Sequence, residues 1–556
     1  MNINLLDYGA LALCFRIDGF RLIFGSITIF LWLITAVFSP GYFASHPKKL
    51  RRYIFFNLLT LLSTLGVFFS SDFRTTFLFF EIMSFSSYPL IIHDENPEAL
   101  RAGETYLAIA IIGGLSILFG MLMIQNLLGT LEFTSLFMQT EIDRQDLYLP
   151  GVLMLIGFGA KAGMFPLHFW LPKAHPVAPA PASALLSGIL IKTGIFGTAI
   201  LSGSLFYGDY TWSMILLIPA VITMVLGALL ALFSDDLKKI IACSSVSQMG
   251  LIFIGIAMQG LPIDGSNFAA GGVLLHILNH SLIKLSLFLA AGIVYMNLGE
   301  LSLEKIRGFG RGKPLFLIIF LISALSISGL PLFSGYLSKT LLHESIVDAV
   351  YWYQNPLGLL GFTDIAFIFT GALTLAYMAK LFTVLFTGEG GKAAARPYIG
   401  PAPAFALGFT ALIVLALGLF PSLMNSIAET GSGFFQGHGD PLRPDYFSAK
   451  NLQSALISVL IGAGIYLLVV RRIIRHSIRW PNVLDIENLL IRPGLKLIIQ
   501  IACFCAAFLA ALPSLPLRKP SPEEPARIGG FSLGLLLAGA GICIALIYVF
   551  INALWI

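Results

Sequence analysis

Residues 157–175 read GFGAKAGMFPLHFWLPKAH, and they decide the fold of the chain. The stretch closes an apolar run that starts near residue 148, yet it contains Lys161 and, five residues later, Pro166. Proline removes a backbone donor and its ring clashes with the preceding turn, so we expect a helix to open here. Within a membrane, opened backbone is tolerated only where it is buried in protein or lines a wet cavity. The stretch therefore predicts a broken membrane helix beside a functional lysine.

The composition of the 556-residue chain is that of an integral membrane protein. Hydrophobic residues make up 57% of it and charged residues only 11%, whereas a soluble globular chain carries roughly 25% charged residues. This composition excludes a cytosolic enzyme, a nucleic-acid-binding protein and a disordered scaffold. The first residues lack a basic segment and a small-residue cleavage site, so we expect no removable signal peptide.

Apolar runs of about 20 residues, the length that a helix needs to cross a bilayer, recur along the whole chain. They predict an all-α polytopic membrane protein with about fifteen transmembrane helices. The expected spans are 18–41, 52–70, 73–92, 102–129, 148–171, 182–204, 212–233, 240–259, 268–297, 314–350, 361–387, 402–424, 451–470, 494–513 and 529–553.

Two of these spans carry the same kind of interruption. The first opens at Pro166, and the long 314–350 run contains Gly329-Leu330-Pro331, with Lys339 two turns later. Grouping the spans in fives places the broken helix fourth in both sets. Because five is odd, the second set runs with opposite polarity, which predicts the inverted repeat of many ion-coupled transporters. Coincidence is the alternative, since glycine and proline are common in membrane helices.

The repeat divides the chain into expected segments. These are an N-terminal helix with a basic inner loop (1–51), a first five-helix repeat (52–204), a second (205–387), a closing core helix (388–424) and a three-helix C-terminal extension (425–556).

The lysines and arginines predict the orientation. If the N-terminus faces outside, 19 of them fall in inside loops and 9 in outside segments, which agrees with the positive-inside rule. We therefore expect a multi-pass protein of the cell membrane with its N-terminus outside. The basic stretch from Arg471 to Trp480 fits the inner interface or contact with anionic lipids.

Charged residues within the spans indicate function, because each costs ~2.5–3.5 kcal/mol at a helix centre on insertion scales. Glu81 is the only carboxylate in its span and shares a helical face with Ser84 and Tyr88. We expect it to pair with a lysine of another helix and to tune that lysine's protonation; a purely structural ion pair is the alternative. Lys161 lies too deep to snorkel to the surface, and Lys192 lies in the middle of the next helix, so both are candidate proton carriers.

His276, His280 and Lys284 follow one another at spacing four and so share one helical face. They form a polar stripe about 12 Å long, at 1.5 Å per residue. Because histidines exchange protons near neutral pH, we interpret the stripe as a proton relay. Buried core histidines or a metal-binding pair are the alternatives, but no acidic residue or cysteine of this helix completes a metal site.

Three more lysines lie in expected spans. Lys339 follows the second break and precedes His343 and Glu344, so it fits a terminal donor or acceptor near the exit; a surface-seeking lysine paired with Glu344 is the alternative. Lys380 lies near the inner end of its helix, where snorkelling is the simpler interpretation, and Lys496 fits an interface anchor.

No motif predicts a cofactor or metal site. The glycine-rich stretches 308–313 and 388–392 lack the GxxxxGK[ST] spacing of a phosphate loop. No GxGxxG motif occurs, and none of the five cysteines forms a CxxC, which disfavours an iron–sulfur cluster or a disulfide framework. We expect no catalytic site and no NADH, flavin or quinone pocket of the chain's own.

Five ordered motifs make the chain similar to the antiporter-like subunits of respiratory complex I, a family that includes Mrp-type sodium/proton antiporter subunits and the membrane arms of energy-converting hydrogenases. They are FLFFEIMSFSSYPL (77–90), GFGAKAGMFPLHFWLPKAH (157–175), DDLKKIIACSSVSQMG (235–250), LHILNHSLIKLSLFLAAG (275–292) and SISGLPLFSGYLSKT (326–340). The resemblance covers about residues 15–425. It implies two inverted five-helix units, proton half-channels joined by a hydrophilic axis, and partner subunits in the membrane.

The resemblance also implies roles for single residues. Glu81 matches the family's glutamate that pairs with a lysine, and Lys161 matches that lysine. Lys192 matches the linking lysine, Lys284 the central one and Lys339 the terminal one. The two histidines near the central lysine match His276 and His280.

The chain departs from the family pattern in several places. It begins almost at the segment 16–19, Cys243 stands where an aromatic residue is common, and no long lateral helix is evident. Residues 484–493 are similar to a segment of Mrp-like and hydrogenase-associated members, which favours that branch.

These observations predict a proton- or sodium-translocating subunit of a multi-subunit complex, resembling NADH:quinone oxidoreductase, a hydrogenase or an Mrp antiporter. An inert packing subunit is one alternative, and the lysines present at every matched position argue against it. A membrane-embedded enzyme with its site in loop 425–450 is the other, and that loop is short and glycine-rich.

Overall fold

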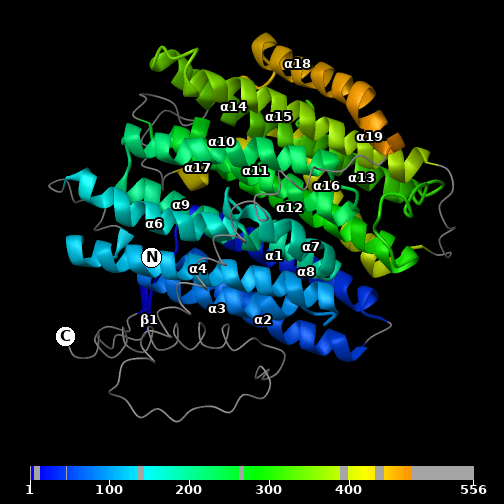
Figure 1. Cartoon of the computed structure of the whole chain (residues 1–556), viewed down its shortest axis with the longest axis horizontal. Helices are drawn as coiled ribbons and strands as arrows, with labels where there is room; N and C mark the ends of the chain where they lie inside the picture. Colours follow the sequence, from blue (N-terminus) through cyan, green and yellow to red (C-terminus); the bar gives the residue numbers. More distant parts are fainter. Residues whose placement is uncertain are drawn as a thin grey trace, which may run out of the picture. The chain divides into compact units, whose positions relative to one another are not determined.

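The computed structural model of the chain describes residues 2–5, 13–44, 47–133, 143–261, 268–388, 398–432 and 444–476. Most of these residues are helical, and the long helices run roughly parallel to one another (Figure 1). A short antiparallel pair of strands, β1 (Asn2–Leu5) and β2 (Leu13–Arg16), precedes the first helix. The all-α fold class is therefore confirmed, with this small hairpin as an addition.

Helices fill the first thirteen expected spans. They are α1 (Gly19–Tyr42), α2 (Pro47–Phe69), α3 (Phe73–Ile91), α4 (Pro97–Leu128), α6 (Arg144–Ala162) with α7 (Trp170–Val177), α8 (Ala180–Leu185) with α9 (Lys192–Leu205), α10 (Tyr210–Phe233), α11 (Leu237–Gln259), α12 (Phe268–Leu298), α13 (Pro314–Ser328) with α14 (Ser334–Trp352), α15 (Leu359–Phe382), α16 (Pro401–Leu419) and α18 (Ala449–Ile465).

Eleven helical stretches in the described part of the chain are long and apolar enough to cross a membrane. Two short helices follow the expected spans: α17 (Pro421–Ser432) after α16, and α19 (Arg471–His476) at the end of the described residues. The expected span 402–424 consists of two helices. Helix α16 ends at Leu419 and α17 begins at Pro421, because proline favours the first turn of a new helix. Likewise α2 starts at Pro47, so the basic residues expected in an inner loop lie in its first turns.

Several predictions concern residues outside the described ranges. These are the spans 494–513 and 529–553, Lys496, the segment 484–493, three of the five cysteines, residues 389–392 of the glycine-rich stretch 388–392, and residues 433–443 of loop 425–450. The proposed segment boundaries also stay predictions.

Both predicted helix breaks are present. Helix α6 ends at Ala162 and is followed by Gly163 with φ 77°, and α13 ends at Ser328 and is followed by Gly329 with φ 75°. A left-handed residue closes a helix C-terminus, and glycine adopts this conformation without a steric cost from a side chain. The chain resumes as the 3-10 helix η2 (Leu167–Phe169) and α7 after the first break, and as α14 after the second.

The loops of the two repeats form the same backbone bridges at opposite ends of the bundle. Phe73 N donates to Leu131 O over 3.0 Å, and Leu237 N donates to Leu301 O over 2.9 Å. Each bridge joins the start of the second helix of a repeat to the segment after its third helix. Five crossings separate the two bridges, so they lie on opposite sides of the membrane. This geometry confirms the inverted repeat.

The described residues contain three π-helices that were not predicted, including η4 (Thr383–Thr387) after α15 and η6 (Tyr466–Val470) after α18. Between α8 and α9 lies the π-helix η3 (Leu186–Leu190), directly before Lys192. Single π-turns inside α-helices widen the turn and occur often at functional sites. The helices at the centre of the bundle, α9, α11 and α12, are almost completely buried, whereas α18 is mostly exposed.

Candidate functional site

The first candidate cluster joins α3, α4 and α6 around the amine of Lys161. This Nζ donates hydrogen bonds to the Tyr106 hydroxyl over 2.7 Å and to Ser84 Oγ over 3.1 Å. Lys161 is 4% exposed and lies directly before the break in its helix. Tyr106 in turn contacts the Ser87 hydroxyl over 2.6 Å. A buried amine is therefore held by a hydroxyl chain from two other helices.

Glu81 lies one turn before Ser84, but it does not form the expected ion pair with Lys161 within 4.0 Å. Its carboxylate turns toward Gly114 of α4, where an added Cβ would lie only 2.4 Å from Oε1. Oε1 is buried and has no hydrogen-bond partner in the described part of the chain. Gly114 leaves room for the Glu81 carboxylate. Ser84, and not Glu81, therefore lies beside the Lys161 amine.

Lys192 links the first repeat to α12. Its Nζ lies 2.6 Å from His280 Nδ1 and donates to Ser187 O over 2.7 Å. Ser187 belongs to the π-helix η3, whose altered hydrogen bonding places this carbonyl toward the amine. Both Lys192 and His280 are fully buried, and His280 Nε2 has no partner among the described residues.

The predicted stripe of α12 is buried, and besides the contact of His280 with Lys192 its members contact α11 and α14. His276 Nε2 lies 3.0 Å from Gln248 Oε1 of α11, and His276 Nδ1 lies 3.0 Å from Ser338 Oγ of α14. Lys284 Nζ donates to Ile241 O over 2.8 Å and to the Ser244 hydroxyl. The stripe thus lies where α11, α12 and α14 meet.

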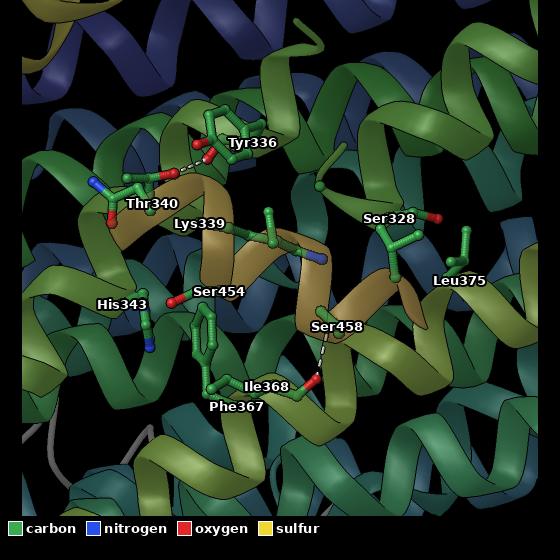
Figure 2. Close-up of a pocket in the computed structure, with 15 residues that line it drawn as sticks. Ser328, Tyr336, Lys339, Thr340, His343, Phe367, Ile368, Leu375, Ser454 and Ser458 are labelled. Carbon is green, nitrogen blue, oxygen red and sulfur yellow. Dashed lines mark hydrogen bonds between the residues drawn. The ribbon is translucent and has the colours of Figure 1, made fainter. Parts of the chain in front are cut away.

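Lys339 lies at the far end of the series, beside the second break. Its Nζ donates to Ile327 O over 2.7 Å, a carbonyl of the last turn of α13. Cations are favoured at helix C-termini because the free carbonyls carry partial negative charge. Figure 2 shows Lys339 in a pocket between α14, α15 and α18, of about 570 Å³ including its open mouth.

The structure brings together some predicted residues and separates others. Lys192 and His280 touch, and the rings of His276 and His280 are 6.4 Å apart. Among the described residues, no direct hydrogen bond joins the Lys161 cluster to Lys192, or Lys284 to either histidine. The predicted residues therefore form neighbouring clusters and not one unbroken chain of side chains.

Sequence reasoning missed several members of these clusters. Tyr106, Gln248 and Ser338 contact predicted residues directly. Gln248 could have been singled out, because a glutamine is unusual inside an apolar helix. Tyr106 and Ser338 could not, because hydroxyl side chains are common in membrane helices. His175 was also missed: it is fully buried, and neither ring nitrogen has a partner in the described part of the chain.

Lys380 does not snorkel, so that interpretation was wrong. The side chain is 2% exposed, and Nζ donates to Leu232 O over 2.9 Å and to Ser234 O over 2.7 Å. The amine caps the C-terminal end of α10, which sequence position alone does not reveal. Among the described residues, no group of three or more His, Cys, Asp or Glu side chains is placed to hold a metal ion.

Comparisons with known proteins identify relatives of the chain. A family model described as NADH:quinone oxidoreductase/Mrp antiporter, transmembrane region, matches residues 70–367. A Staphylococcus saprophyticus protein provisionally named antiporter subunit mnhA2 is 31% identical over 395 residues, which are 67% of this chain and 48% of that protein. Hydrogenase-4 component B of Escherichia coli K12 is 34% identical over 318 residues, 56% of this chain and 47% of that protein. The chain thus spans about half the length of these relatives.

The fold is also similar to a solved structure. A chain of the Mrp complex from Dietzia sp. DQ12-45-1b superimposes with a TM-score of 0.67 at 22% sequence identity, covering 82% of this chain and 89% of that one. At this identity the likeness concerns the fold alone.

Proposed function

Because the chain belongs to the NADH:quinone oxidoreductase/Mrp antiporter transmembrane family, we propose that it translocates protons as an antiporter-like membrane subunit of a multi-subunit complex. The proton passes from Lys161 to Lys192, then along the α12 stripe, and reaches Lys339. Glu81 acts on this path through its charge, because movement of the carboxylate toward or away from Lys161 changes how well that amine holds a proton.

One observation carries this proposal. Buried polar atoms in proteins are nearly always hydrogen bonded, to protein or to ordered water. Several buried polar atoms beside the candidate carriers have no partner among the described residues: Glu81 Oε1, His280 Nε2, Asn279 Oδ1 and both ring nitrogens of His175. Water is the partner that satisfies such atoms. Water at these positions would bridge the clusters that side chains alone leave apart.

The chemistry of the carriers favours protons over sodium. Amines and imidazoles bind and release protons, whereas an alkali cation needs oxygen ligands and is repelled by ammonium groups. Each candidate lysine already donates hydrogen bonds to carbonyl or hydroxyl groups or contacts an imidazole. These contacts fit an amine that transfers a proton between neighbours.

We further propose that the protein is a multi-pass protein of the cell membrane with its N-terminus outside, and that its partners are other membrane subunits. The solved relative belongs to an Mrp complex, and one sequence relative is a hydrogenase component. Genes for a hydrogenase, a quinone oxidoreductase or small antiporter subunits beside this gene would identify which assembly it joins.

The test uses vesicles that contain the complex assembled with its own partner subunits. We expect Glu81→Gln, Lys161→Met and Lys284→Met each to lower proton flux at least tenfold while assembly is unchanged. The matched control is Lys239→Met, because Lys239 is exposed at the start of α11. Normal flux in all three variants would overturn the mechanism.

A further inference from the structure

A histidine–aspartate pair lies between Lys339 and the exposed end of the bundle. His343 follows Lys339 by one helical turn on α14, a rise of about 6 Å, and both side chains line the same pocket (Figure 2). His343 Nε2 lies 2.7 Å from Asp364 Oδ1, and Asp364 belongs to the next helix, α15. The side chain of His343 is 9% exposed and that of Asp364 is 32% exposed. The pair thus extends from this pocket to a partly exposed carboxylate.

The pocket gives a polar surface between the amine and the imidazole. Tyr336 and Thr340 of α14 contribute hydroxyls on one side, and Ser454 and Ser458 of α18 contribute them on the other (Figure 2). The centre of a water molecule can occupy about 60 Å³ of this pocket, and one water needs roughly 10–15 Å³ of such space, so the pocket has room for several. Hydroxyls and water can carry a proton between groups that do not touch.

The imidazole is held in one orientation. Its ring stacks on Phe367 with centroids 5.2 Å apart and an angle of 23° between the planes. Nε2 is engaged by Asp364, while Nδ1 makes no hydrogen bond within the described residues. One nitrogen is therefore committed to the carboxylate and the other is left for the pocket.

The other charged groups nearby are engaged elsewhere. Glu344, the next residue of α14, pairs with Lys450 at 3.3 Å. Asp348 lies more than one turn further along the helix. Among the described residues that line the pocket, the titratable side chains are those of Lys339, His343 and Tyr336, and the Tyr336 hydroxyl donates to Tyr446 O.

We propose that His343 and Asp364 form a proton-release site that follows Lys339. The protonated amine of Lys339 gives a proton through the pocket to His343 Nδ1. The imidazolium then gives its Nε2 proton to the Asp364 carboxylate, which releases it to water. Exchange with water restores the starting tautomer, and no other reactant is consumed. This inference rests on the proposed function and names the group that takes the proton after the last lysine.

The test compares variants of this pair in vesicles that contain the assembled complex. We expect His343→Ala and Asp364→Asn to lower proton flux about tenfold or more. Glu344→Gln is the control, because it removes a neighbouring charge of the same helix without touching the pocket. Imidazole added on the side where α14 ends should restore most of the flux in His343→Ala, because the shortened side chain leaves space for it.

Each outcome decides one claim. If Glu81→Gln, Lys161→Met and Lys284→Met all transport normally, the proposed function fails whatever His343 does. If Lys284→Met stops transport but His343→Ala and Asp364→Asn transport normally, only the release site is wrong. Loss of flux in His343→Ala that imidazole does not restore, with normal flux in Asp364→Asn, would show a structural role and overturn the proposal. If His343→Ala does not assemble, the flux of Asp364→Asn decides.

Discussion

The substitution Gly114→Ala tests the role of Glu81 without changing its chemistry. An added Cβ would lie 2.4 Å from Glu81 Oε1 and 2.8 Å from Cδ, whereas unstrained contacts need about 3.5 Å. The carboxylate must therefore retreat by roughly 1 Å. It is the end of a flexible side chain, so the backbone can stay in place. Alanine also favours a helix over glycine by roughly 0.5–1 kcal/mol, so we expect no loss of stability.

A misplacement of about 1 Å can cost roughly 100-fold in rate even when the mutated residue does not itself react. We therefore expect proton flux in vesicles with the assembled complex to fall ten- to 100-fold in Gly114→Ala, while the melting temperature is equal or higher. Gly408→Ala is the control: it makes the same helical exchange with no atom within 4 Å of the added Cβ. Unchanged flux in Gly114→Ala would refute the idea that the position of Glu81 controls transport.

Three further outcomes are expected. Replacing His280 by Phe should stop flux and leave Lys192 in place, because it removes the ring nitrogen 2.6 Å from that amine; flux above half of normal would contradict the relay. Lys380→Met should lower stability by about 1–3 kcal/mol, because two buried carbonyls lose their donor. It should keep the proton flux per assembled complex. A stable variant without flux would show that Lys380 takes part in transport and is not only a helix cap. Burial and the nearby Arg52 guanidinium lower the pKa of His93 to about 4. The folded protein therefore keeps this ring neutral down to about pH 4, whereas the unfolded chain binds a proton on it below about pH 6.5. Stability should fall as the pH drops from about 6.5 toward 4, by about 2 kcal/mol at pH 5, and thermal unfolding of His93→Leu should lack this part of the loss; equal pH dependence in both proteins would contradict the assignment.

The sequence predicts the fold where the signal is local. Gly163 and Gly329 end their helices because a proline follows within three residues, and that information lies within one turn. The bridge between Phe73 and Leu131 joins residues far apart in the chain, so no local pattern reveals it. The π-helix η3 escapes prediction because a widened turn does not interrupt the apolar pattern.

The candidate site is predicted in the same uneven way. A lysine such as Lys161 or Lys284 stands out because a charge in an apolar run needs a reason. Tyr106 and Ser338 do not stand out, since their importance depends on which helices pack against them. Lys380 was assigned wrongly for the same reason. The sequence shows how far Lys380 lies from the end of its own helix, but it does not show that its amine caps the end of α10.

Whether water joins the buried carriers can be seen in a cryo-electron microscopy map of the assembled complex at a resolution that shows ordered water. We expect water density beside Glu81 Oε1 and His280 Nε2, and between Lys161 and Lys192. Tightly packed apolar side chains at these places, with no water density, would contradict it.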